Sequence, residues 1–281
     1  MIKVAFITGA SRGIGRETAL AFARAGFDVA ISARTVEEGE QHSHALRDAT
    51  GEPLAGSLNG TAQAIRELGR QVLVVPMDLL DSASALEACG KVIAEFGRID
   101  VLVNNAIYQG RDLNSGFLAL QPQTLERVVQ GYVLTPFLLT RAVAEQMIKQ
   151  GGGVVINVTS GAGESDPPVA ADKGGWGYAY GAGKAAVSRL SGVLAVELGE
   201  QGIRAYTLNP GVVSTEALKA TIGDQGVIAL RAGIAPPQVP AQVMLWLATS
   251  PEAPRYQRRT LAAQALALEH KIVADWRDEP R

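Results

Sequence analysis

The first 25 residues hold the pattern that most constrains how this 281-residue chain folds. A short apolar run rich in β-branched residues, 3–8, ends abruptly in Gly9-Ala10-Ser11-Arg12-Gly13-Ile14-Gly15, and residues 16–25 then have helical spacing. We interpret this as a strand, a glycine turn and a helix. Glycines let the backbone turn tightly, and the N–H groups and dipole at the start of a helix favour a diphosphate. The spacing differs from GxGxxG.

The same alternation continues along the chain. Apolar strand candidates at residues 28–33, 71–76, 101–104, 154–159 and 203–209 alternate with helical spacing at 61–68, 82–96, 122–149 and 178–200. Alternating strands and helices predict βαβ units, and therefore an α/β fold with a doubly wound parallel sheet between two helical layers. Because no repeat or linker interrupts the series, we expect one domain across residues 1–281.

Two segments interrupt this rhythm. Residues 35–60 are polar and glycine-rich, and they are longer than an ordinary strand-to-helix connection, so we expect an irregular insertion there. It contains two histidines, His42 and His44, and we interpret them as part of a solvated loop rather than a metal site. The second segment, 161–177, contains two adjacent prolines and a Gly-Gly-Trp-Gly run, and we expect a second insertion.

The helix predicted from residue 178 carries a tyrosine and a lysine at a chemically informative spacing. Tyr180 and Lys184 are separated by one helical turn, so both side chains lie on one face. An ammonium beside a phenol favours the phenolate and lowers the phenol pKa from about 10, which makes the tyrosine usable as an acid or base. Tyr178 competes for this role, but the residue four positions after it is Ala182, so Tyr180 is preferred.

Five ordered motifs resemble those of the short-chain dehydrogenase/reductase family across residues 3–250. They are the TGxxxGxG pattern at Thr8 to Gly15, Asn104-Asn105-Ala106-Ile107 after the fourth strand, Ser160 after the fifth, the YxxxK pattern of Tyr180 and Lys184, and Asn209-Pro210-Gly211-Val212-Val213-Ser214-Thr215. The family has a Rossmann-like fold. The resemblance therefore implies NAD(P)-dependent hydride transfer between a carbonyl and a secondary alcohol, with a small molecule as substrate.

The resemblance also assigns the site residues. It makes Ser160, Tyr180 and Lys184 catalytic: the serine binds the substrate oxygen, the tyrosine exchanges its proton, and the lysine holds the ribose and lowers the tyrosine pKa. The implied cofactor contacts are Gly9, Ser11, Arg12, Gly13, Ile14, Gly15, Arg34, Asp78, Leu79, Asn105, Ala106, Tyr180, Lys184, Pro210, Gly211, Val213 and Thr215.

The end of the second strand predicts which nicotinamide nucleotide is used. An acid there would bind the free ribose 2′-hydroxyl and repel a 2′-phosphate, but the segment Ala30-Ile31-Ser32-Ala33-Arg34 has none. Arg34 can meet the phosphate, and Arg12 resembles a second basic residue that the family uses for NADP. We therefore expect NADP(H), with NAD(H) as the alternative.

Three departures from the family pattern leave a second function open. Tyr132 stands where an asparagine normally anchors a relay water, and it holds a water, blocks the site or reflects a shifted alignment. Ile107 replaces a glycine, and residues 216–281 form a variable C-terminal segment that ends unlike the family's tail. A nucleotide-dependent sensor without robust turnover is the alternative to an enzyme.

Composition limits the partners. A net charge of −2 gives no electrostatic signal for nucleic acid or an anionic membrane, and no apolar run is long enough to span a bilayer. The one cysteine, Cys89, is interpreted as a buried small residue, and we expect a cytoplasmic protein. The family resemblance implies a homo-oligomer, a tetramer or dimer built on the helices at 122–149 and 178–200.

Substrate identity is not readable from these residues. The pocket is expected to form from residues 106–114, 161–177 and 216–240, which are mostly apolar or small and favour a medium or bulky apolar ketone or alcohol. Trp176 is either a lid or pocket residue, or packs the insertion onto the domain.

Overall fold

The computed structural model describes residues 1–221, 233–274 and 276–277. Its strands are β1 Val4–Thr8, β2 Asp28–Ser32, β3 Val72–Val74, β4 Val101–Asn104, β5 Gly153–Val158, β6 Ile203–Asn209, β7 Val212–Val213, β8 Ile234–Ala235 and β9 Thr260–Ala262. Its α-helices are α1 Gly13–Arg24, α2 Leu58–Glu67, α3 Ser82–Phe96, α4 Pro122–Val128, α5 Thr135–Lys149, α6 Tyr178–Glu197, α8 Gln238–Thr249 and α9 Ala263–Glu269. The shorter helical segments are η1 Val129–Leu134, η2 Gly161–Gly163, η3 Ala171–Lys173, η4 Gly199–Gln201 and η5 Ala253–Tyr256.

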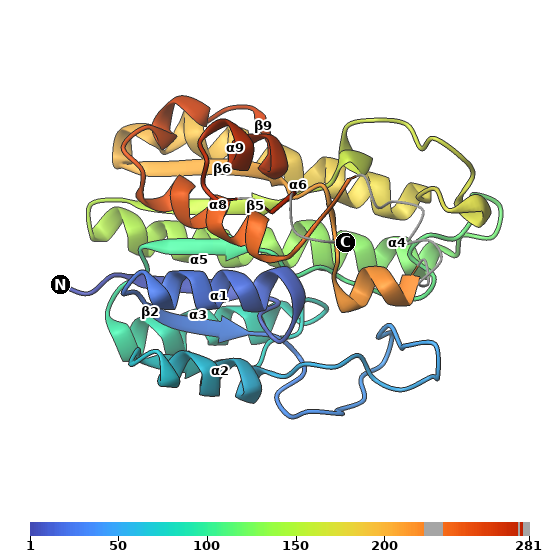
Figure 1. Ribbon diagram of the computed structural model, residues 1–281, viewed down its shortest axis with the longest axis horizontal. Helices are drawn as coiled ribbons and strands as arrows, with labels where there is room; N and C mark the ends of the chain where they lie inside the picture. Colours follow the sequence, from blue (N-terminus) through green and yellow to red (C-terminus); the bar gives the residue numbers. More distant parts are fainter. Residues whose placement is uncertain (222–232, 275, 278–281) are drawn as a thin grey trace.

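Seven strands form one parallel sheet in the order β3-β2-β1-β4-β5-β6-β9 (Figure 1). In its register Ile7 of β1 lies between Ile31 of β2 and Val103 of β4. The order reverses between β1 and β4, and ligands of open α/β sheets bind at such a reversal, outside the carboxyl ends of the strands. The predicted doubly wound α/β fold is confirmed.

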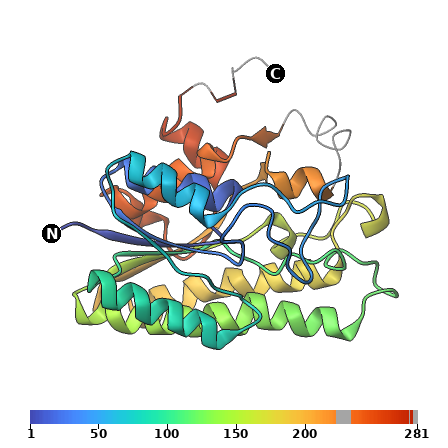
Figure 2. The ribbon, with the colours of Figure 1, turned by 90° about the horizontal axis from the view of Figure 1, so that it is seen from below.

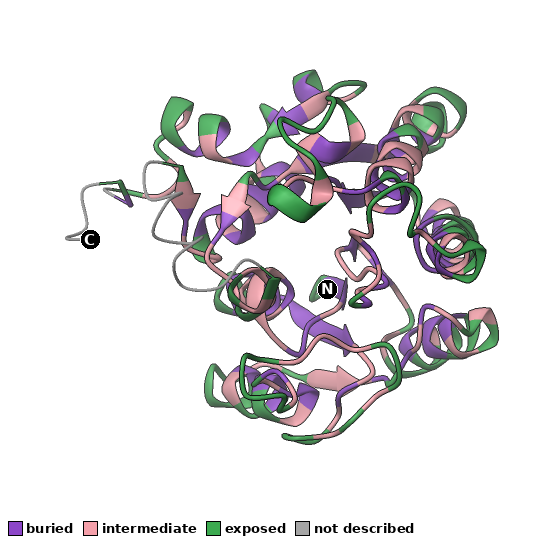
Figure 3. Ribbon diagram, turned by 90° about the vertical axis from the view of Figure 1, so that its right-hand side faces the viewer, coloured by how far each residue is buried: buried purple, intermediate pink, exposed green. Residues whose placement is uncertain are grey.

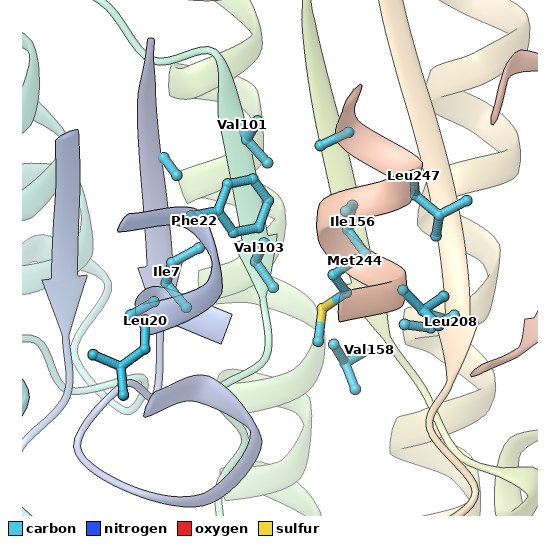
Figure 4. Packing of buried hydrophobic residues seen from close by; sticks show 14 of the residues in the cluster. Ile7, Leu20, Phe22, Val101, Val103, Ile156, Val158, Leu208, Met244 and Leu247 are labelled. Atoms are coloured by element: carbon cyan, nitrogen blue, oxygen red, sulfur yellow. The ribbon is translucent and has the colours of Figure 1, made fainter. Parts of the chain in front are cut away.

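The strands are apolar because both faces of the sheet are covered. Helices α1, α2, α8 and α9 pack on one face, and α3, α5 and α6 on the other (Figure 2). On the first face, Phe22 of α1 and Met244 of α8 pack over Ile7 and Ile156 (Figure 4). On the second, Phe6 and Leu102 pack with Leu139 of α5 and the buried Cys89 of α3, whose predicted burial is confirmed.

The helix predicted over residues 122–149 is interrupted. Its middle turn, η1, is a π-helix between α4 and α5. Pro136 explains this locally, because it has no N–H to donate to the carbonyl of Tyr132 four residues earlier. Gly131 contributes too, since a Cβ there would lie 3.0 Å from Cβ of Tyr108. The spacing of apolar residues in the sequence does not reveal a π-helical turn.

The insertion at residues 35–57 is irregular, as expected, apart from one isolated bridge between Arg47 and Pro53 (Figure 1, blue loop at lower right). Helix α2 begins at Leu58, earlier than predicted, because the Ser57 side chain accepts a hydrogen bond from the Gly60 N–H and caps it. Part of the expected substrate segment, residues 222–232, lies outside the described residues.

The sequence did not predict β9, α8 or α9, which close the sheet beside β6. Strand β9 has only three residues, too few for a periodic signal. None of the described helices is long and apolar enough to cross a bilayer. The carboxyl edge of the sheet faces the viewer in Figure 3, where buried strands are enclosed by helices with exposed outer faces.

Candidate active site

The glycine turn after β1 is packed tightly against the segment after β4. Gly9 has φ +70°, and a Cβ there would lie 2.9 Å from Nδ2 of Asn105. A Cβ on Gly15 would lie 2.1 Å from the Gly9 carbonyl oxygen. A side chain at either position would push the turn away from β4, so both glycines are required for this close approach.

Thr8 joins the two segments through its hydroxyl. Its Oγ1 accepts the N–H groups of Asn105 and Ala106, each at 3.0 Å, and donates to the Val103 carbonyl at 3.1 Å. Nδ2 of Asn105 donates to the Thr8 carbonyl at 3.0 Å. Asn105 and Ala106 therefore lie beside the glycine turn, and the Asn105 amide holds the two strand ends together.

The start of α1 is uncapped, and the Glu216 carboxylate lies beside it, with Oε2 3.6 Å from the Cβ position of Gly13. The N-cap of α1, Arg12, makes no capping hydrogen bond, and no acidic residue lies in its first turn. The N–H groups of Gly13, Ile14 and Gly15 begin the helix, where N–H groups have no carbonyl four residues earlier in the helix. On the other side, a Cβ on Gly13 would lie 3.2 Å from Cγ2 of Thr215, so Thr215 lies beside this turn.

The end of β5 is joined to α6 by buried hydroxyl groups. Thr159 Oγ1 donates to the Lys184 carbonyl at 3.1 Å and lies 2.7 Å from Ser188 Oγ, which also bonds that carbonyl at 3.0 Å. Ser160 follows directly and accepts the Ala162 N–H at 3.3 Å. These contacts fix Ser160 against the first turns of α6, where Tyr180 and Lys184 lie.

Tyr180 lies within hydrogen-bonding reach of Ser160. Burial raises the pKa of the Tyr180 phenol, and the hydrogen bond with the Ser160 side chain opposes the rise. The sequence predicted a pKa lowered by Lys184, and this direction is wrong. The physical reason is that desolvation is the largest effect on Tyr180 and the Lys184 ammonium is directed elsewhere.

Lys184 is buried, with 3% of its surface exposed. Its Nζ donates to the Val158 carbonyl at 2.9 Å and lies 5.7 Å from the centre of the Tyr132 ring. Burial lowers the pKa of the ammonium to about 7. Lys184 is thus a desolvated cation held by one backbone oxygen and one aromatic ring.

Arg12 and Arg34 both contact the insertion. Arg12 Nε donates to the Ala55 carbonyl at 2.8 Å, and its Nη2 donates to the carbonyls of Leu54 and Gly56, each at 2.9 Å. Arg34 donates from one amino group, Nη1, to the Ser43 carbonyl at 2.9 Å. Arg12 is therefore anchored by backbone oxygens, and its Nη1 group makes no hydrogen bond to any residue in the described ranges.

The remaining predicted contacts lie along the same edge of the sheet. Asp78 follows β3, where its Oδ1 accepts the Leu80 N–H at 2.9 Å, and Leu79 is buried. Pro210, Gly211 and Val213 follow β6, and Asn209 Oδ1 accepts the Gly211 N–H at 3.0 Å. Each lies after the carboxyl end of a strand, the edge at which such sheets bind ligands.

A polar cluster that sequence reasoning missed stabilises the segment after β4. The Asp112 carboxylate accepts hydrogen bonds from Tyr108 Oη at 2.8 Å, from Thr124 Oγ1, and from Arg127 Nη1 at 3.2 Å. These residues are spread over 20 positions in loop and helix, so no short motif could have identified them.

Apolar side chains surround the outer end of the site. Phe117 and Leu118 are 77% and 97% exposed, and the Phe117 ring lies 6.3 Å from that of Tyr178. Asn114 accepts the Gly177 N–H at 3.2 Å, which joins the segment after β4 to the second insertion. Trp176 packs over the start of α6, where a Cβ on Gly181 would lie 3.6 Å from its ring.

Comparison with known proteins agrees with this arrangement. The family model described as short chain dehydrogenase matches residues 3–58 and 53–226. Cyclohexanol dehydrogenase of a Rhodococcus species is 34% identical over 80% of this chain and 79% of its own length. The 7alpha-hydroxysteroid dehydrogenase of Escherichia coli is 32% identical, over 78% of this chain and 74% of its own.

Solved structures give the same result. Acetoin dehydrogenase from Enterobacter cloacae matches with a TM-score of 0.72 at 28% identity, covering 93% of this chain and 94% of its own. A 7α-hydroxysteroid dehydrogenase complexed with NADH and 7-oxo glycochenodeoxycholic acid matches with a TM-score of 0.74 at 29% identity, covering 92% of each chain. The chain belongs to the short-chain dehydrogenase family of NAD(P)-dependent oxidoreductases.

Proposed function

We propose that this protein uses NADP(H) to interconvert a carbonyl compound and a secondary alcohol, with Tyr180 as the acid and base. The observation that carries the proposal is that Tyr180 lies close enough to Ser160 for that side chain to lower its pKa, one helical turn before the buried Lys184. A hydroxyl that binds an oxygen, next to a phenol that exchanges a proton, suits the reduction of a carbonyl group.

The residues present fit a nicotinamide nucleotide. The N–H groups of Gly13, Ile14 and Gly15 at the uncapped start of α1 would hold its diphosphate. Lys184 would hold ribose hydroxyls, Asp78 the adenine, and Thr215 would close over the nicotinamide. When bound, the nucleotide supplies or takes up the hydride.

The chain's own side chains then carry the proton chemistry. Ser160 orients the substrate oxygen by hydrogen bonding, and Tyr180 donates its phenol proton to that oxygen during reduction. Because burial raises the Tyr180 pKa, the phenol is protonated at neutral pH and ready to donate. In oxidation the Tyr180 phenolate takes the proton back from the alcohol.

A preference for NADP(H) is supported by basic residues where the family places the 2′-phosphate. Strand β2 ends in Ser32, followed by Ala33 and Arg34, without an acid that would repel a phosphate. Arg12 Nη1 and Arg34 are the groups proposed to bind it, with Arg12 fixed by its carbonyl contacts.

Fluorescence titration with NADPH and NADH tests the preference without a substrate. We expect NADPH to bind more tightly, and Arg34→Ala to remove most of that difference while NADH affinity stays the same. Arg47→Ala, on the same insertion and bonded to Gln41 and Gly51, is the matched control. Equal affinity for the two nucleotides in the unmodified protein would overturn the preference.

The proposed substrate is a medium or bulky apolar ketone or alcohol. This follows from the exposed Phe117, Leu118 and Tyr178 at the outer end of the site. We propose a homo-oligomer as well, because Val129, Phe137, Val193 and Val196 are exposed apolar residues on η1, α5 and α6. Light scattering of the protein and of Val196→Glu tests this, and a monomer in both would contradict it.

A panel of ketones with NADPH tests the catalytic proposal. Tyr180→Phe keeps the ring but removes the exchanging proton, so we expect a loss of roughly 10²–10⁴-fold in kcat with NADPH affinity retained. Tyr178→Phe, two residues earlier and exposed, is the control and should keep kcat. NADPH binding without turnover of any ketone would favour a nucleotide sensor.

A further inference from the structure

The aromatic ring of Tyr132 lies beside the Lys184 ammonium. The π-helical turn η1 carries Tyr132 into the core, where 2% of its surface is exposed and its ring centre lies 5.7 Å from Lys184 Nζ. Its hydroxyl donates to the Tyr108 carbonyl at 3.0 Å. A cation at this distance from a ring centre is attracted by the ring, so Tyr132 and the Val158 carbonyl together hold the ammonium.

The space for this ring is provided by glycine. A Cβ on Gly183, the residue before Lys184, would lie 2.7 Å from Cδ1 of Tyr132. Even alanine at that position would displace the ring or the helix. Tyr132 therefore packs against α6 next to Lys184.

A cavity of about 300 Å³ lies between α5 and α6 and is bordered by Tyr132. Its lining includes Tyr132, Val158, Asn104, Phe137 and Leu190. Two of these, Tyr132 and Val158, are also the residues that hold the Lys184 ammonium. Lys184 is not among the residues that line the cavity, whereas these two residues that contact its ammonium are.

The groups around Lys184 show why its separation from water affects its pKa. The titratable side chains are Tyr180 on its own helix, Tyr132 on η1, and Tyr108, which contacts Tyr132. Desolvation alone accounts for the lowered Lys184 pKa, without a contribution from any carboxylate among the described residues. The pKa of the Lys184 ammonium therefore depends on whether water reaches it from the side of Tyr132.

We propose that Tyr132 is a positioning residue that separates the Lys184 ammonium from the cavity between α5 and α6. It fixes Nζ against the Val158 carbonyl and excludes water from that side. The catalytic consequence of this proposal rests on the proposed function, whereas the shielding itself does not.

The test is an NMR pH titration of ¹³C- and ¹⁵N-labelled lysine in the full chain. The Lys184 signal is assigned by its loss in Lys184→Met. In Tyr132→Asn, water from the cavity reaches the ammonium, and we expect the Lys184 pKa to rise by about one pH unit or more. Tyr132→Phe keeps the ring and should titrate as the unmodified protein does. Val133→Asn, the adjacent change on η1, is the matched control and should do the same.

Two results would overturn the proposal: an unchanged Lys184 titration in Tyr132→Asn, or an equal rise in Tyr132→Phe. If circular dichroism shows that Tyr132→Asn does not fold, Tyr132→Leu replaces it. Leucine is smaller than the ring and leaves space for water beside the ammonium, so a rise is again expected and its absence contradicts the shielding.

A second readout concerns catalysis. With a ketone from the panel, the pH at which kcat changes because Lys184 titrates should move upward in Tyr132→Asn and stay in place in Tyr132→Phe. A merely structural role would lower kcat without moving this pH. The NMR titration needs neither nucleotide nor substrate, so failure of the proposed function leaves the test of shielding intact.

Discussion

Two desolvated cations in this molecule are held in opposite ways. Arg12, beside the glycine turn, donates to three backbone carbonyls of the insertion, and Glu216 and Glu38 lie near enough to oppose the fall in its pKa. Lys184, beside Tyr180, donates to one carbonyl and faces an aromatic ring. Burial lowers the pKa of both.

The difference separates a cation anchored by three carbonyls, with only its Nη1 group left for a ligand, from one held by a single carbonyl. The Arg12 contacts satisfy carbonyls that would otherwise lack partners and fix the insertion to the glycine turn. The Lys184 ammonium is desolvated with few compensating bonds, so it costs stability in the folded chain. Active sites commonly carry such a cost, because function requires the unfavourable group.

The largest effect that would sharpen this contrast is a gain in stability on removing the Lys184 charge. Its pKa is about 7 in the folded chain, against an ordinary lysine value of 10.5, so the unfolded chain binds more protons between these values. Stability of the unmodified protein therefore rises as pH increases from about 7 to 10.5. We expect Lys184→Met to raise the free energy of unfolding by roughly 2–4 kcal/mol at pH 7.

Urea unfolding at several pH values measures this, and the advantage of Lys184→Met should shrink as pH approaches about 10. Lys91→Met is the control, because Lys91 is exposed and paired with Glu87 on α3. A variant less stable than the unmodified protein at pH 7 would show that the Lys184 ammonium is stabilising, and the contrast with Arg12 would be lost.

Arg12→Met should lower stability, whereas Lys184→Met should raise it. The Arg12→Met change removes the donors to Leu54, Ala55 and Gly56, and we expect a loss of about 1–3 kcal/mol in the free energy of unfolding. The insertion should also become more open to proteolysis. Limited proteolysis with mass spectrometry measures this, and cleavage within residues 35–57 at an unchanged rate would argue against Arg12 as its anchor.

Gly56→Ala tests the same anchor without changing a charge. Gly56 has φ +109°, and a Cβ there would lie 2.6 Å from the Ser11 carbonyl oxygen. Gly51→Ala is a matched control, since Gly51 has φ +91° in the same insertion but no atom within 4 Å of its Cβ position. We expect Gly56→Ala to cost about 1–2 kcal/mol more than Gly51→Ala in thermal unfolding. Equal costs would mean that the contact with Ser11 contributes nothing.

The smallest expected effect is on the KM for the substrate. Phe117→Ala removes an exposed ring beside Tyr178, so we expect KM for a bulky apolar ketone to rise about threefold to tenfold with kcat retained. Leu268→Ala, an exposed apolar residue on α9, is the control. Steady-state kinetics with a small and a bulky ketone measure this, and an equal change for both would exclude a size-dependent contact.

Much of the fold could be predicted because each motif is local. The strand, glycine turn and helix of residues 3–25 and the strands up to β6 carry short-range signals that the structure confirms. The break at η1 was not predicted, although Pro136 is a signal for one. The close packing of Gly131 against Tyr108 was hidden, because it forms only in the folded chain. Three-residue β9 gave no periodic signal.

The site divides in the same way. Residue type and spacing predicted that Tyr180 and Lys184 would share a helix face after Ser160. They could not predict the electrostatics, because the raised Tyr180 pKa depends on burial and the lowered Lys184 pKa on desolvation in the assembled core. The Arg12 contacts with residues 54–56 were equally hidden, since 42 to 44 positions separate the partners.

Transfer of deuterium is the most direct test of the central claim that this site moves hydride between a nicotinamide and a carbonyl carbon. The protein is incubated with NADPH deuterated at the transferring position and a ketone from the panel, and the product is analysed by mass spectrometry. We predict one deuterium on the carbinol carbon of the alcohol, absent with Tyr180→Phe. The experiment is done with NADPH labelled on one face of the nicotinamide ring and then on the other. An alcohol formed without deuterium on that carbon in both cases would contradict the claim.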